Sequence, residues 1–331
     1  MLPPYSRIAV LGGGAWGTAL AAAALAAGRD TLLWAREDDV VSDIRQANEN
    51  KRFLPGIALP RTLRATTVLA EAASAEALLL AVPAQVLGEF ARMLAPLVAP
   101  GTPLVICAKG IEKESGRLVN EVLAEAAPKA TPAILSGPSF ARDVAKSLPT
   151  AVTIAAPGDV AERLQASLSA PFFRPYASDD VVGVALGGAA KNVYAIACGV
   201  VEGLGLGENA RAALLARSFA ELARLGEALG ARRETLMGLS GLGDLVLTAT
   251  SKSSRNFSFG VDLGQGRSMS ELAAPDRPLA EGVATAPALV KRARRENVEL
   301  PIAEAMADLL SGALPLGEAV TRLMTRRLTS E

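Results

Sequence analysis

The pattern of apolar positions changes near residue 180 of the chain. Before that point, short runs of consecutive apolar residues recur, as expected of strands that are covered on both faces. After it, long stretches with helical spacing take over. The predicted strands span residues 7–11, 31–35, 77–82, 103–108, 133–135 and 151–155, and the predicted helices of the second half span residues 181–201, 210–229, 286–296 and 301–310.

Buried strands that alternate with helices form a parallel, doubly wound sheet. The chain of 331 residues has the length of two domains, since a domain typically holds about 150 residues. We therefore predict an α/β protein with a doubly wound sheet in residues 1–180 and an all-helical domain in residues 181–331.

The first predicted strand leads directly into a glycine-rich turn. Residues 12–17 read GGGAWG, and an alanine-rich helix over residues 18–27 follows. In this strand–turn–helix context, Gly12, Gly14 and Gly17 form the G-x-G-x-x-G pattern of a Rossmann-type dinucleotide site, in which the helix N-terminus faces the phosphates. The alternative is an ordinary glycine turn.

The second predicted strand ends next to Arg36. The residue at this position meets the adenosine ribose, where an arginine can hold a 2′-phosphate and an acidic residue favours the free hydroxyl. Arg36 therefore indicates NADP(H), although the acidic run of residues 37–39 (EDD) follows closely. A solvated arginine after a strand remains the alternative.

Other polar or turn residues also follow predicted strands. Pro83 follows the third strand, Lys109 the fourth, and residues 137–139 (GPS) the fifth. Ligands of parallel sheets bind beyond the carboxyl ends of the strands, so these positions are expected to lie near a ligand. The alternative for Lys109 is an ordinary surface charge on a turn.

The predicted helix over residues 181–201 is apolar on all sides, apart from Lys191 and the neighbouring Asn192. It is long enough to cross a bilayer, but these two polar residues and the interspersed glycines favour a buried globular helix and no membrane span. A buried ammonium needs partners or a chemical role. Taken alone, the helix leaves open whether Lys191 is catalytic or extends its ammonium to the surface.

Two polar segments of the second half are candidates for substrate contacts. Asp244 follows three closely spaced glycines and shares a helical face with Thr248, four residues on. Residues 250–256 (TSKSSRN) combine hydroxyls, a guanidinium and an amide, which suits a phosphate dianion. The alternatives are a simple helix cap at Asp244 and a polar surface loop after it.

Composition excludes several kinds of function. Basic and acidic residues both number 34, so the net charge favours neither nucleic acid nor a membrane surface as a partner. The chain has no histidine, which excludes imidazole chemistry, and its two cysteines are far apart, so no metal site is expected. The N-terminus lacks an export signal, which predicts a cytoplasmic protein.

A nicotinamide cofactor implies hydride transfer coupled to a proton on oxygen. A histidine cannot supply that proton here, and none of the three tyrosines has a lysine four residues later. The chain has no G-x-x-x-x-G-K-[ST] motif, so phosphoryl transfer of the P-loop type is also excluded. Lys191 remains as the proton donor.

Eight segments of the chain together resemble the bacterial NAD(P)-dependent glycerol-3-phosphate dehydrogenases over essentially the whole length. These segments are GGGAWGTALA, VPAQVLGE, AKGIE, GRL and LSGPSFA in the first half, and KNVYAIACGVVEGLGLGENARAALL, MGLSGLGDLVLT and SRN in the second. The chain departs from many members of that family at Ala15, where they carry serine, and at Leu279, where they often carry valine.

The resemblance implies the conversion of dihydroxyacetone phosphate to sn-glycerol 3-phosphate for glycerophospholipid synthesis, with NADPH or possibly NADH. It also implies a homodimer, and a helical domain like that of 6-phosphogluconate dehydrogenases. It makes Lys191 the catalytic residue. The implied substrate contacts are Lys109, Gly137, Ser139, Lys191, Asp244, Ser254, Arg255 and Asn256. The implied cofactor contacts, with the motif glycines Gly12, Gly14 and Gly17, are Ala15, Trp16, Arg36, Lys109, Ala141, Arg255, Leu279 and Glu281.

Two other functions stay open from the sequence. One is another lysine-dependent dehydrogenase, of the β-hydroxyacid or 6-phosphogluconate type, against which the MGLSGLGDL and SRN segments argue. The other is a non-catalytic dinucleotide sensor, which is expected to lose the pair of Lys191 and Asp244 that this chain retains.

Overall fold

The computed structural model describes residues 3–272, 274 and 280–324 of the chain. Leu279, one of the predicted cofactor contacts, lies outside the described residues.

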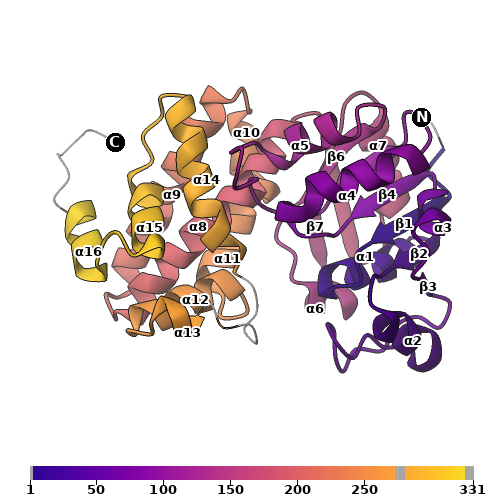
Figure 1. The fold of residues 1–331 in the computed structure, drawn as a ribbon, viewed down its shortest axis with the longest axis horizontal. Helices are drawn as coiled ribbons and strands as arrows, with labels where there is room; N and C mark the ends of the chain where they lie inside the picture. The colour runs from indigo at the N-terminus through magenta and orange to yellow at the C-terminus, as the bar shows by residue number, and fades with distance from the viewer. Residues whose placement is uncertain (1–2, 273, 275–279, 325–331) are drawn as a thin grey trace. The chain divides into compact units, whose positions relative to one another are not determined.

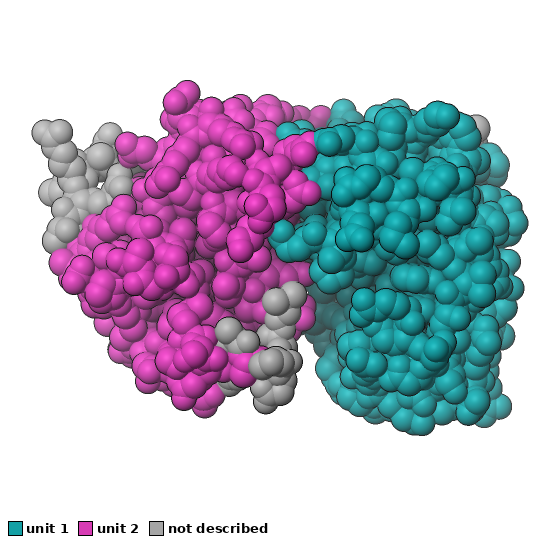
Figure 2. All heavy atoms as spheres, viewed as in Figure 1, with its two compact units in different colours: residues 1–109, 118–185 teal, residues 110–117, 186–331 magenta. Residues whose placement is uncertain are grey.

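The chain divides into two compact units, which Figure 2 shows in different colours. Unit 1 comprises residues 1–109 and 118–185, and unit 2 comprises residues 110–117 and 186–331. The long helix α8 (Val181–Gly203) begins in unit 1 and continues into unit 2. The domain boundary expected between residues 180 and 181 stays a prediction, and each unit is described by itself.

Unit 1 is built on a sheet of eight strands in the order β3-β2-β1-β4-β5-β6-β7-β8 (Figure 1). The strands are β1 (Arg7–Leu11), β2 (Asp30–Trp34), β3 (Arg64–Thr66), β4 (Ala77–Leu80), β5 (Pro103–Ile106), β6 (Thr131–Ser136), β7 (Thr150–Ala155) and β8 (Phe173–Ser178). The strand order reverses at β1, where Val10 pairs with Leu33 of β2 on one side and with Leu79 of β4 on the other. This is the switch point at which doubly wound sheets bind their ligands.

The sequence pattern predicted a parallel sheet, and this prediction is wrong for one pair of strands. Strands β1 to β6 run parallel, but β6 and β7 pair antiparallel, with Leu135 opposite Ile154. The link between β6 and β7 holds only the short helix α6 (Ala141–Ala145), which does not carry the chain back across the sheet. A link that stays at one edge returns its strand antiparallel.

Helices cover both faces of this sheet. They are α1 (Ala15–Ala26), α2 (Asp38–Ala47), α3 (Leu69–Ala73), α4 (Leu87–Leu94), α5 (Val119–Ala126), α6 and α7 (Val160–Leu168), with the short 3₁₀ turns η1 (Ala84–Val86) and η2 (Ala95–Leu97). Alternate residues of a strand point to opposite faces. Ile8 and Val10 accordingly join a core with α1, α2, α6 and α7, whereas Ala9 and Leu11 join one with α3, α4 and α5. The predicted Rossmann-type fold is confirmed.

Unit 2 is helical and is organised around α8. Its other helices are α9 (Glu208–Ala228), α10 (Arg233–Met237), α11 (Asp244–Thr250), α12 (Arg255–Gly264), α13 (Met269–Leu272), α14 (Glu281–Arg295), α15 (Pro301–Ser311) and α16 (Leu316–Met324), and a π-helical turn, η3 (Leu239–Gly243), precedes α11. The predicted helical second half is confirmed.

Helix α8 is a core helix. Among the described residues it is the single helix long and apolar enough to cross a membrane, yet 89% of its apolar window is buried within the protein. Glycines let it approach its neighbours closely. A Cβ at Gly199 would lie 2.1 Å from the Phe257 carbonyl oxygen of α12, and one at Gly260 of α12 would lie 2.1 Å from the Ile196 oxygen of α8. The two backbones are therefore in direct contact.

Candidate active site

The glycine turn between β1 and α1 is packed as a dinucleotide-binding loop requires. Gly12 has a φ of +129°, and a Cβ there would lie 2.5 Å from the Ala81 carbonyl oxygen. A Cβ at Gly17 would lie 1.9 Å from the Gly12 carbonyl oxygen. Both positions therefore exclude any side chain, and the turn holds α1 directly against the end of β1.

The start of α1 fits the phosphates of a dinucleotide. Gly14 precedes the helix, and a Cβ there would meet no atom within 4 Å, so space is open beside it. Ala15 and Trp16 open the helix and are half-buried, and the indole N–H of Trp16 is buried without a hydrogen-bond partner in the described part of the chain. The first amides of a helix have no partner within it and attract anions.

Asn50 holds the glycine turn in place, although no sequence pattern pointed to it. Its side chain is fully buried and donates 2.8 Å hydrogen bonds to the Gly13 carbonyl oxygen and to the Thr18 hydroxyl. Its amide oxygen accepts a hydrogen bond from the main-chain N–H of Phe53. Asn50 thus ties the turn to the first residues of α1.

Arg36 follows β2 at the edge of the sheet where the glycine turn lies. Its side chain is 84% exposed, and one guanidinium nitrogen lies 3.0 Å from the Glu37 carboxylate. This exposed position is compatible with both interpretations of Arg36, a contact to a 2′-phosphate and a solvated surface arginine.

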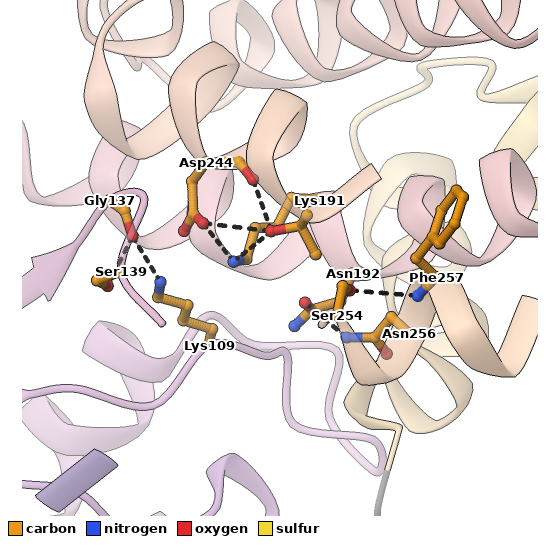
Figure 3. Close-up of polar contacts among 10 residues, drawn as sticks. Lys109, Gly137, Ser139, Lys191, Asn192, Asp244, Ser254, Asn256 and Phe257 are labelled. Atoms are coloured by element: carbon orange, nitrogen blue, oxygen red, sulfur yellow. Dashed lines mark hydrogen bonds and ion pairs between the residues drawn. The ribbon is translucent and has the colours of Figure 1, made fainter. Parts of the chain in front are cut away.

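Lys109, Gly137 and Ser139 lie together in unit 1 (Figure 3). The Lys109 ammonium and the Ser139 hydroxyl each donate a 2.9 Å hydrogen bond to the Gly137 carbonyl oxygen. Gly137 has a φ of +139°, and a Cβ there would lie 2.9 Å from the Val152 Cα. Because β5 and β6 are parallel to β1, these residues belong to the same sheet edge as the glycine turn. Ala141, a predicted cofactor contact, begins α6 and is half-buried.

Lys191 lies in unit 2 against the first turn of α11 (Figure 3). Its ammonium donates to the Asp244 carboxylate at 2.5 Å and to the Thr248 hydroxyl at 2.9 Å. The Lys191 side chain is 8% exposed and that of Asp244 1%. A buried charge is stable only when it is paired and hydrogen-bonded, and this ammonium is both. Lys191 is therefore not a snorkelling surface lysine.

Thr248 connects the two ends of this ion pair. Its hydroxyl donates to the Asp244 main-chain oxygen at 2.6 Å, and so it presents a lone pair to the lysine. Asp244 and Thr248 lie on one face of α11, as their spacing predicts. The arrangement fixes the position of the Lys191 ammonium.

A second polar cluster of unit 2 adjoins Lys191 in the sequence. Asn256 of α12 donates to the Asn192 side-chain oxygen at 2.9 Å and accepts a hydrogen bond from the Gly282 N–H of α14. Both asparagines are buried. The cluster joins α8, α12 and the start of α14, where the predicted cofactor residue Glu281 lies half-buried.

Ser254 and Arg255 flank the start of α12. The buried Ser254 hydroxyl caps this helix by accepting from the Phe257 N–H at 3.2 Å. Arg255 begins the helix and its side chain is exposed. An exposed guanidinium beside the N-terminal amides of a helix offers anion contacts.

Glu221 forms another buried polar contact in unit 2. This α9 carboxylate accepts hydrogen bonds from the main-chain N–H groups of Ile302 and Ala303, at the start of α15, and from the Tyr194 hydroxyl of α8. Burial raises the pKa of Glu221 to about 7, against the opposing effect of these hydrogen bonds and of the Arg224 charge. Burial also raises the pKa of the free Cys198 thiol, to about 12.

The fold and these side chains define a class of protein. A glycine turn at the switch point of a doubly wound sheet is the geometry of a dinucleotide site, and unit 2 adds a buried lysine that is paired with a carboxylate. The chain is therefore a nicotinamide-dependent oxidoreductase with a helical second unit.

Comparison with known proteins gives the family. The model of the NAD-dependent glycerol-3-phosphate dehydrogenase N-terminus matches residues 7–161, and that of the C-terminus matches residues 180–321. The chain is 55% identical to glycerol-3-phosphate dehydrogenase [NAD(P)+] of Parvibaculum lavamentivorans, over 99% of this chain and 98% of that one. It is 56% identical to the enzyme of the same name from Bradyrhizobium sp. strain ORS 278, with the same coverage.

A solved structure agrees with these matches. The crystal structure of glycerol-3-phosphate dehydrogenase from Coxiella burnetii has a TM-score of 0.91 and 37% identity, and the similarity covers 98% of this chain and 99% of that one. The chain belongs to the NAD-dependent glycerol-3-phosphate dehydrogenase family. The sequence-based predictions of the family, of an oxidoreductase and of an NAD(P) cofactor are confirmed.

Proposed function

We propose that this protein interconverts dihydroxyacetone phosphate and sn-glycerol 3-phosphate, with Lys191 as the proton donor and acceptor. The observation that carries the proposal is the buried Lys191 ammonium, held by Asp244 and Thr248 in a chain of this family. The proposed product is a precursor of glycerophospholipids.

Lys191 acts on the carbonyl oxygen of the substrate. In the direction of reduction, the ammonium donates a hydrogen bond to this oxygen, stabilises the negative charge that develops on it and transfers a proton to it. The Asp244 carboxylate and the Thr248 hydroxyl accept hydrogen bonds from the lysine and hold its ammonium in place. In the reverse direction, neutral Lys191 removes the hydroxyl proton of glycerol 3-phosphate.

The cofactor contacts are assigned to unit 1, with contributions from Arg255, Leu279 and Glu281. The amides at Gly14, Ala15 and Trp16 hold the pyrophosphate, and Arg36 holds the 2′-phosphate of NADPH. The bound nicotinamide supplies the hydride for the carbonyl carbon. NADH remains usable because the acidic residues after Arg36 do not block a free 2′-hydroxyl.

The substrate phosphate is assigned to cationic and amide side chains. Arg255 offers a planar fork of donors that suits a phosphate dianion, and Ser254 and Asn256 flank it. Lys109, Gly137 and Ser139 form the polar edge in unit 1 that we assign to the substrate as well. Binding energy from the remote phosphate positions the carbonyl for reaction.

A substrate panel tests the proposed activity. NADPH oxidation is followed with dihydroxyacetone phosphate, unphosphorylated dihydroxyacetone and a β-ketoacid. We expect turnover of the phosphorylated ketone only, because the other compounds lack the phosphate that Arg255 binds. Preferred turnover of the β-ketoacid would instead indicate a dehydrogenase of the β-hydroxyacid type, and no turnover of any ketone would favour a dinucleotide sensor.

Replacement of the lysine tests its role. Lys191→Ala is expected to lower kcat by about 1000-fold, the usual range for loss of a general acid, with an unchanged dissociation constant for NADPH measured by fluorescence. Lys129→Ala, at an exposed lysine, is the control and is expected to retain wild-type turnover. Retained turnover in Lys191→Ala would refute the assignment.

We further propose a cytoplasmic homodimer that associates through unit 2. Four large apolar side chains of this unit, Leu204, Leu206, Met237 and Val246, are exposed, and burial of such side chains against a second copy favours association. Two buried free thiols suit a reducing compartment. Light scattering at micromolar concentration is expected to give twice the mass of the chain.

A further inference from the structure

The position of Asp244 depends on the π-helical turn η3, which ends where α11 begins. The Gly243 N–H of this turn donates to the Gly238 carbonyl oxygen at 3.0 Å, a bond that spans five residues. A π turn contains one more residue than an α turn and so rotates the helix that follows it. The turn therefore decides which face of α11 carries Asp244.

Helix α8 contacts this turn through a glycine. A Cβ at Gly187 would lie 2.6 Å from the Ser240 carbonyl oxygen and 3.0 Å from the Gly241 Cα. Real Cβ atoms essentially never come so close to a carbonyl oxygen, so the backbone of η3 rests on α8 only because residue 187 has no side chain. Ser240 and Gly241 are both buried.

The turn is fixed on a second side as well. A Cβ at Gly241 would lie 1.9 Å from the Leu236 carbonyl oxygen at the end of α10. The backbone of η3 is therefore in close contact with the end of α10 as well as with α8.

Gly187 and Lys191 are four residues apart on α8 and share one face of the helix. The glycine contact and the Lys191–Asp244 ion pair are thus consecutive contacts between α8 and one continuous segment, η3 followed by α11. Any displacement of η3 moves Asp244 relative to the Lys191 ammonium. The hydrogen bond between the ammonium and the Asp244 carboxylate is only 2.5 Å long, so a displacement lengthens it.

We propose that Gly187 is a positioning residue for the reaction: by seating η3 directly on α8 it sets Asp244 and Thr248 against Lys191. This inference rests on the proposed function of Lys191. It extends the site to a residue without any functional group, which acts through Asp244 and touches no substrate.

Gly187→Ala tests the proposal, with Gly203→Ala as a matched control. Both glycines lie on α8, and a Cβ at Gly203 would lie 2.3 Å from the Val261 carbonyl oxygen of α12, far along the helix from Lys191. We expect Gly187→Ala to lower kcat by about 100-fold, the size of loss that a misplacement of about 1 Å causes. KM for dihydroxyacetone phosphate should change less than threefold. Gly203→Ala should lower Tm by a similar amount but keep kcat within threefold.

A double-mutant cycle shows whether Gly187 acts through Asp244. If it does, Gly187→Ala causes no further loss of kcat in an Asp244→Asn background, whereas two independent losses would multiply. Wild-type-like kcat in folded Gly187→Ala, or independent losses in the cycle, would overturn the proposal.

Two further measurements keep the proposal testable. If Gly187→Ala does not fold, Asp244→Glu keeps both the charge and the turn but lengthens the carboxylate arm. If the contact between Gly187 and η3 fixes the position of Asp244, this variant loses kcat by at least tenfold, and retained kcat would contradict the proposal.

If the wild-type protein turns over no ketone, the proposed function fails, but the contact between Gly187 and η3 can still be tested. Lys191 is then labelled with an amine-reactive reagent, and the labelling is measured by mass spectrometry. Labelling should rise at least fivefold in Gly187→Ala and stay unchanged in Gly203→Ala, and an unchanged rate in both would refute the inference.

Discussion

At the scale of single residues, the ion pair of Lys191 and Asp244 is maintained by burial and hydrogen bonding together. Removing one member of a buried pair is costly because the other charge remains without compensation, typically about 3–5 kcal/mol. Asp244→Ala is therefore a poor probe of chemistry, since it disturbs the fold as well. Asp244→Asn keeps the shape of the side chain and removes only the charge.

Residues with a local signal could be predicted from the sequence, and residues defined by distant contacts could not. Lys191 stood out as the one charge in an apolar helix, and Asp244 followed a run of glycines. Asn50 gave no such signal, because its partners Gly13 and Thr18 are more than thirty residues away and a lone asparagine near a turn is common. The contact between Gly187 and η3 could not be predicted either, because the sequence of a helix does not show which of its glycines packs against a carbonyl oxygen of another element.

Arg36 is expected to set the preference between the two nicotinamide cofactors. Arg36→Asp replaces a cation that can pair with the 2′-phosphate by an anion that accepts from the ribose hydroxyl. The ratio of kcat/KM for NADPH to that for NADH should fall by at least tenfold. Arg174→Asp, an exposed arginine on the edge strand β8, is the control and should leave the ratio unchanged. An unchanged ratio in Arg36→Asp would exclude Arg36 as the discriminating residue.

At the scale of elements, the central strands were predictable and the edge strands were not. The buried strands β1, β4 and β5 are continuous apolar runs, which the sequence pattern detected to within two residues. Strands β3 and β8 form the two edges of the sheet and were missed. An edge strand has fewer neighbours, and β8 accordingly alternates buried and exposed residues around Pro175.

The turn between β1 and α1 is expected to depend on Asn50. Asn50→Leu removes the two hydrogen bonds that fix Gly13 and Thr18 and the one accepted from Phe53, each worth about 1 kcal/mol. A less ordered turn presents its amides less well to the phosphates, so the dissociation constant for NADPH should rise about tenfold, measured by fluorescence titration. The control is Gln165→Leu, which removes a similar bond to the Pro175 carbonyl oxygen on α7 and β8. Equal affinity in Asn50→Leu and the wild type would show that the turn is rigid without Asn50.

At the scale of the whole molecule, the two types of hydrophobic pattern were enough to predict a doubly wound sheet followed by helices. What the pattern does not contain is the arrangement among the helices of unit 2, because it depends on backbone contacts rather than on the size of apolar side chains. Gly199 and Gly260 each exclude a Cβ by contact with a carbonyl oxygen of the partner helix. The same contact positions Asn192 and Asn256, whose hydrogen bond lies between the same two helices.

The pH dependence of stability is expected to depend on Glu221, because burial raises its pKa in the folded protein to about 7 from an ordinary value of 4.5. The folded state then binds the proton more tightly, so this contribution to the free energy of unfolding is fully present below pH 4.5 and is lost as the pH rises to about 7. The loss is on the order of 3 kcal/mol, since one pKa unit corresponds to about 1.4 kcal/mol.

Glu221→Gln removes the titration. The free energy of unfolding in urea should therefore decrease less between pH 5 and pH 8 for this variant than for the wild type. Glu227→Gln, at an exposed position of the same helix, should behave as the wild type does. Equal decreases in the wild type and Glu221→Gln would mean that Glu221 stays ionised in the folded protein, held by its bonds to Ile302, Ala303 and Tyr194.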